Sequence, residues 1–229
     1  MKKILLIIIA LSVSFCTTGE SVKKIDPSKP YISIEFSFNT ESYHSFIKKF
    51  YPQIAIWITS KNENPKTLYV TSKGAKNNWF GADERPSALP IWRQIQKQET
   101  DTSIDTISGA TPSGTTYRVE ANLPRGFNPK NPIEIHIEAN ISFDYNKAFP
   151  EKAPVGSKEF SGVNGQPSLL WKGTILPGKA KTTVTPEIIG HGNLLGKDGK
   201  LYRDLSKITT AKNIFTYIKI KYHKPGDLK

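Results

Sequence analysis

Strict alternation of apolar and polar residues is the dominant pattern along this chain. In the segment 31–38, four apolar side chains alternate with serine and glutamate residues. A period of two residues is typical of a β-strand with one buried face. The longest alternation runs from Ile133 to Phe143. The same pattern predicts further strands at residues 53–59, 67–71, 117–121, 169–175, 182–189 and 215–222.

Helical periodicity is limited to two short segments. Ser87 is expected to cap a helix that reaches Gln98, and Thr209 is expected to open a single turn before Ile214. Turns rich in Gly, Pro and Asn separate the strands, and no strand-helix-strand repeat is present. The chain therefore predicts an all-β fold, an immunoglobulin-like antiparallel β-sandwich with one or two short helices.

Two hairpin turns and one core residue follow from residue type. Residues 62–65 are predicted to turn the chain between the strands at 53–59 and 67–71. Residues 197–200 contain Asp198-Gly199, a pair that supplies the positive φ angles of a tight turn. Trp57 alternates with isoleucines in its strand, and we expect it to pack in the core.

The N-terminal residues resemble a bacterial export signal. Two lysines precede an apolar run that ends well short of the 20 or so residues that span a bilayer. Cys16, the only cysteine, follows this run, which resembles a lipoprotein signal with Cys16 as the lipid attachment site. That site normally has Gly, Ala or Ser before the cysteine, whereas this chain has Phe15. The alternative is an ordinary signal peptide that is cleaved after Ser14 or Cys16.

These features divide the chain into three parts and give it a location. Residues 1–16 are the predicted signal peptide, 17–30 a linker with two X-Pro pairs, and 31–229 a single β-sandwich domain. We expect the protein to be exported to the periplasm or the cell surface, and to be held there on a membrane by the lipid.

A positive net charge narrows the class of partner. The chain has 32 Lys and Arg against 20 Asp and Glu, a net charge of +12. Loss of Lys2 and Lys3 with the signal peptide leaves 30 minus 20, or +10. The basic residues are scattered, so no nucleic-acid interface is predicted. A general positive field instead favours an anionic membrane surface as partner.

His44, His136 and His223 have no ligand spacing between them, so no structural zinc site is predicted. His191 lies between Gly190 and Gly192, directly after a predicted strand. A catalytic or metal-binding role and a turn residue bonded to the backbone are both open for His191.

A polar stretch at 100–116 contains the most specific motif of the chain. Asp105 stands three residues before the run Ser108, Gly109, Ala110 and Thr111. This spacing resembles the acceptor motif for covalent flavinylation, in which a flavin transferase moves FMN from FAD onto the threonine hydroxyl. The motif is found in flavin-bearing subunits of the sodium-pumping quinone reductase. A plain strand-to-turn corner is the structural alternative.

A second resemblance covers most of the chain after the linker. It is similar to a family of predicted periplasmic proteins, domain of unknown function family 2271. Members of that family are often encoded beside flavin transferases and membrane electron-transfer proteins. The segments that carry the resemblance are Gln53–Ile58, Ile91–Trp92, the motif at 105–111, Val163–Ser168, Gly190–Gly192 and Leu201–Ala211.

The two resemblances together imply an extracytoplasmic, flavin-carrying electron-transfer module with FMN on Thr111. Its implied partners are a flavin transferase and membrane electron-transfer proteins, and it would be a redox carrier rather than a stand-alone enzyme. The alternative is a non-catalytic binding or scaffold sandwich anchored to the surface. A hydrolase is the weakest candidate, because no nucleophile stands near a base in the sequence.

Overall fold

The computed structural model describes residues 21–22, 25–40, 51–76, 87–99, 107–109, 116–124, 127–128, 130–179 and 182–227. Several sequence predictions lie outside these residues. They are the signal peptide with Cys16, and Asp105, Ala110 and Thr111 of the flavinylation motif.

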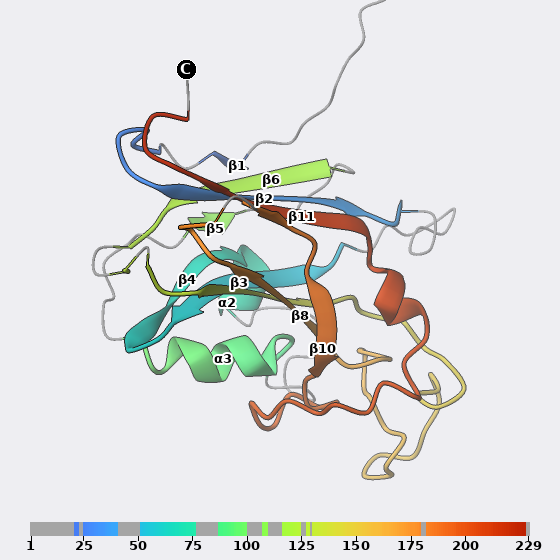
Figure 1. Ribbon diagram of the computed structural model, residues 1–229. Helices are drawn as coiled ribbons and strands as arrows, with labels where there is room; N and C mark the ends of the chain where they lie inside the picture. Colours follow the sequence, from blue (N-terminus) through green and yellow to red (C-terminus); the bar gives the residue numbers. More distant parts are fainter. Residues whose placement is uncertain are drawn as a thin grey trace, which may run out of the picture.

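Two β-sheets lie face to face as the layers of a sandwich (Figure 1). One has the order β1 (Ser21–Val22), β6 (Thr116–Asn122), β2 (Tyr31–Phe38), β11 (Phe215–His223), β9 (Thr183–Val184). The other has the order β10 (Glu187–His191), β8 (Leu169–Ile175), β7 (Ile133–Asn140), β3 (Gln53–Ser60), β4 (Glu63–Thr71), β5 (Ile107–Gly109). Helices α2 (Ser72–Lys76) and α3 (Pro90–Gln96) and a 3₁₀ turn η1 (Thr210–Asn213) complete the described elements.

Antiparallel pairing builds the body of both sheets. Four strands of the first sheet and five of the second pair in this way. The short strands β1 and β5 add to the edges in parallel, β1 beside β6 and β5 beside β4. The predicted β-sandwich with short helices is therefore confirmed.

The strand predicted at 182–189 is wrong, because the chain changes sheet in the middle of it. Thr183–Val184 pairs with β11 in the first sheet, whereas Glu187–His191 pairs with β8 in the second. Pro186 lies between the two strands and has no N–H for a ladder. One predicted strand thus contributes to both layers.

Three local predictions need correction as well. The first hairpin turns at Lys61 and Asn62, with φ of 64° at Asn62, so β4 already begins at Glu63. Ser87 does not cap α3, which begins at Pro90. Instead the Ser87 hydroxyl accepts the Leu89 N–H at 3.3 Å.

At 197–200 the positive φ belongs to another residue than predicted. Gly196 has φ of 67°, and Gly199 is not among the residues with positive φ. The predicted single turn after Thr209 is confirmed as η1.

Two hydrophobic clusters lie on opposite faces of the six-stranded sheet. Ile54, Ile56 and Ile58 of β3 face the other sheet and join the main core. Trp57 of the same strand points away from that core and packs in a second cluster with Trp92 of α3. The predicted burial of Trp57 is confirmed, with 1% of its surface exposed. In Figure 1, α3 accordingly covers the outer face of this sheet.

Residues 141–168 connect β7 to β8 without regular secondary structure, and side-chain bonds hold them to η1. The Gln166 side chain accepts the Thr209 N–H at 2.6 Å and donates to the Thr210 hydroxyl at 2.6 Å. The Thr210 hydroxyl also donates to the Asp144 carboxylate. Gly165, with φ of 73°, lies so close to Asp144 that a Cβ there would meet its carbonyl at 2.4 Å.

We expect the substitution Gly165→Ala to loosen this connection. Its added methyl overlaps the Asp144 backbone, so the free energy of unfolding should fall by at least about 3 kcal/mol in urea denaturation. Gly156→Ala is the matched control, because Gly156 has φ of 88° but no atom within 4 Å of its Cβ position. It should cost only about 1 to 2 kcal/mol. Equal losses in both variants would show that the close approach is not important.

Candidate functional site

The described part of the flavinylation motif lies at a sheet edge. Ser108 and Gly109 end strand β5, where they stand opposite Val70 and Thr71 of β4. β5 is the outermost described strand of the six-stranded sheet, and the next described strand, β6, belongs to the other sheet. Asp105, Ala110 and Thr111 of the motif lie outside the described residues.

Helix α2 stands beside this edge and is held there by side chains. It follows β4 directly and contacts both β3 and β5. Arg93 of α3 donates to the carbonyl oxygens of Gly74 at 2.7 Å and Ala75 at 3.2 Å. The Thr71 hydroxyl donates to the Gln53 side chain at 2.8 Å. These hydrogen bonds hold helix α2 and the end of β4, which pairs with Gly109, in place.

The chain that enters the polar stretch at 100–116 is also fixed. The Glu99 carboxylate accepts the Thr67 N–H at 2.8 Å and the Thr67 hydroxyl as well. That hydroxyl in turn accepts the indole N–H of Trp92 at 3.0 Å. Glu99 thereby ties the segment after α3 to strand β4, one residue before the stretch begins.

His191 ends strand β10, at the opposite edge of the same sheet. Five strand spacings of about 4.8 Å separate β10 from β5, or roughly 24 Å, so His191 does not belong to the motif's site. Its Nδ1–H donates to the Gly192 carbonyl at 2.7 Å, and its ring stacks on Tyr202 at 5.5 Å. A Cβ at Gly190 would meet the Tyr202 carbonyl at 2.4 Å. These contacts bond His191 to the backbone, as in one of the two roles left open for it, but at the end of a strand rather than in a turn.

Glu138 is a fully buried carboxylate that the sequence did not single out. It lies on the outer face of β7, where its oxygens accept the N–H groups of Ile91 at 3.3 Å and Trp92 at 2.7 Å. It also accepts the Ser168 hydroxyl at 2.7 Å. These bonds satisfy the first turn of α3 and fasten the helix to the sheet, which gives Glu138 a structural role.

His136 on β7 is a half-buried ionisable group of the same face. Its ring stacks on Trp57 at 5.2 Å, and its Nε2 lies 3.0 Å from the Thr59 hydroxyl. Its Nδ1 is buried and has no hydrogen-bond partner among the described residues. Burial lowers the pKa of His136 to about 4, although the nearby Glu134 carboxylate acts in the opposite direction. His136 is consequently neutral at pH 7.

Ser33 and His223 form a hydrogen-bonded pair that sequence reasoning missed. The Ser33 hydroxyl lies 2.8 Å from His223 Nε2, and the His223 ring stacks on Tyr31 at 4.1 Å. Burial is the main cause that lowers the pKa of His223. Both residues are less than 7% exposed, so the pair offers no open nucleophile. No local sequence pattern indicates this pair, because Ser33 and His223 meet only through the register of β2 and β11.

Within the described ranges, no three His, Cys, Asp or Glu side chains are grouped to hold a metal ion. No described helix is long and apolar enough to cross a membrane. No known protein-family model matches the chain, and no curated protein matches it. The two resemblances therefore rest on the sequence motifs alone.

The burial of His136 predicts a pH dependence of stability. The folded pKa of about 4 is below the ordinary value of 6.5, so the unfolded chain binds more protons between these values. Stability is fully present above pH 6.5 and falls as the pH falls towards 4. Between pH 7.5 and 5 we expect His136 to account for a loss of at most about 2 kcal/mol in urea denaturation.

The substitution His136→Gln should flatten this slope. His223 contributes in the same direction, so a smaller slope should remain and should disappear in the double variant with His223→Gln. The range above pH 5 avoids the titration of Glu134, whose pKa is lowered chiefly by Lys172. A slope that His136→Gln leaves unchanged would contradict the prediction.

Proposed function

We propose that this protein is an extracytoplasmic electron-transfer module that carries FMN on Thr111. The observation that carries the proposal is the five-position match at Asp105, Ser108, Gly109, Ala110 and Thr111. A supporting observation is the place of Ser108 and Gly109 in an edge strand, since an acceptor must be reached by a transferase. Hydrogen bonds hold helix α2 and the end of β4 in place, and these two elements support that edge.

The modification is a phosphoryl transfer from FAD. A bond forms between the Thr111 hydroxyl oxygen and the phosphorus of the FMN half, and the bond to AMP breaks. AMP leaves, and the hydroxyl proton passes to solvent or to a base of the transferase. Small neighbours such as Gly109 and Ala110 let the transferase approach the backbone closely. Asp105 is proposed to position the hydroxyl or the metal ion of the transferase.

Once attached, the flavin would supply the redox chemistry, and the chain would supply its tether and electrostatic surroundings. Lys73 and Lys76 of α2, next to β5, are exposed. Positive charges beside a flavin favour its anionic reduced form and so raise its reduction potential. The proposed partners are a flavin transferase and electron-transfer proteins of the membrane.

The test is the intact mass of the protein exported by a host with an active flavin transferase. We expect an added mass of one FMN in the natural chain and none in Thr111→Ala, because the alanine has no hydroxyl to accept the phosphorus. Thr115→Ala is the matched control, since it lies in the same polar stretch outside the motif and should keep the full addition.

Covalent flavin in Thr111→Ala would refute the site. An unmodified natural chain, with the transferase active on a known acceptor, would refute the function. The second result would favour the alternative of a surface-anchored binding or scaffold sandwich.

A further inference from the structure

The segment predicted as a linker is docked onto the domain at the edge of the five-stranded sheet. Ser21–Val22 pairs with β6 as strand β1. Farther along, the Asp26 N–H donates to the Asn122 side chain at 2.8 Å, which in return donates to the Asp26 carbonyl at 2.9 Å. The Gly226 N–H donates to the Pro27 carbonyl at 2.9 Å. Contacts between this segment and the domain therefore begin at Ser21.

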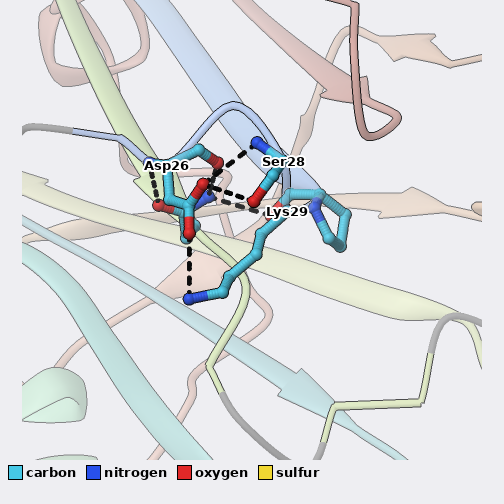
Figure 2. Close-up of polar contacts among 5 residues, drawn as sticks. Asp26, Ser28 and Lys29 are labelled. Carbon is cyan, nitrogen blue, oxygen red and sulfur yellow. Dashed lines mark hydrogen bonds and ion pairs between the residues drawn. The ribbon is translucent and has the colours of Figure 1, made fainter.

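The turn after β1 is locked by its own side chains. Figure 2 shows the Asp26 carboxylate with Ser28 and Lys29, which bond it at 2.6 Å through the Ser28 hydroxyl and at 3.0 Å through the lysine ammonium. The hydrogen bonds from Ser28, followed by that from Lys29, lower the pKa of Asp26 to about 2. The turn thus keeps its charges paired at any ordinary pH.

This docking leaves little free chain before the domain. From Cys16 to Ser21 is five residues, which span at most about 18 Å when fully extended. A lipid on Cys16 would hold the β1 edge within that distance of the membrane. The outer face of the five-stranded sheet begins at this edge.

Two exposed lysines stand on this outer face. Lys219 and Lys221 are exposed on β11, on the side opposite the core residues Ile218 and Ile220. In the part of the chain that the structure describes, neither lysine has a carboxylate within ion-pair distance. Lys224, just after β11, is exposed as well.

The acidic residues of the same face are already engaged. Glu120 on β6 pairs with Arg118 at 2.6 Å. Glu35 on β2, opposite Lys219 in the register, accepts the Tyr217 hydroxyl at 2.8 Å. Lys219 and Lys221 are therefore the lysines of this face without an ion-pair partner among the described residues, while Glu35 keeps its negative charge opposite Lys219.

We propose that the outer face of the five-stranded sheet docks on anionic phospholipid headgroups through Lys219 and Lys221. The orientation rests on the proposed lipid attachment at Cys16, whereas the headgroup binding itself needs neither lipid nor flavin. In this arrangement the β11 lysines face the bilayer, and the α3 side of the sandwich faces away from it (Figure 1).

The experiment uses the exported full chain with Cys16→Ser, so that no lipid hides the contribution of charge. Its partition onto vesicles of phosphatidylglycerol and phosphatidylcholine is measured by flotation. Near an anionic surface each lysine contributes about a fivefold gain in binding, so Lys219→Gln/Lys221→Gln should weaken the partition about 25-fold. High salt should remove binding of the natural sequence, because it screens these charges.

Lys152→Gln/Lys158→Gln is the matched control. It removes the same net charge from two exposed lysines in the 141–168 connection, away from β1 in Figure 1. We expect less than a threefold loss in this variant. An equal loss in both variants would show an effect of net charge alone and would overturn the proposal.

Absence of binding to anionic vesicles by the natural sequence would overturn it too. Urea denaturation of each variant checks that the substitutions leave the fold intact. Thr111→Ala and the unflavinylated chain should bind like the natural sequence, so a failure of the flavin proposal is distinguishable from a failure of this one.

Discussion

Burial of the six-stranded sheet on both faces is the constraint on which the rest of the structure depends. An ordinary sandwich sheet exposes its outer face, but here Trp57 and Trp92 build a second core on that side. A helix must cover this core, and its free N–H groups must be satisfied next to apolar side chains. The Glu138 carboxylate does this for α3. Because α3 is fixed, Arg93 can hold α2 beside the motif's edge strand.

The same arrangement explains why the two ends of this sheet differ. At the β5 edge, hydrogen bonds from Glu99, Thr71 and Arg93 hold β4 and α2 in place. At the β10 edge, His191 and Tyr202 close the sheet by pairing their backbones and stacking their rings. One edge carries Ser108 and Gly109 of the motif, and the other is closed by the contacts of His191 and Tyr202.

Strands with one clear apolar face could be predicted from the sequence, which is why β2 and β8 match their predicted bounds. β5 could not, because three residues carry no period and their pairing with β4 depends on the tertiary fold. The break at Pro186 was hidden by the β-branched residues on both sides of it, which are typical of strands. Ser33 and His223 meet across most of the chain length, so no local pattern indicates them. The motif at 105–111 was found because its chemistry depends on residue identity and spacing rather than on the fold.

The pairing of β2 with β11 has a consequence for the timing of folding. It joins one of the first described strands to the last, and β11 is a central strand that lies between β2 and β9. The five-stranded sheet cannot close before nearly the whole chain has been synthesised, and contacts so distant in sequence form slowly. During synthesis, β2 therefore waits for its partner β11 until almost all of the other described strands have been made.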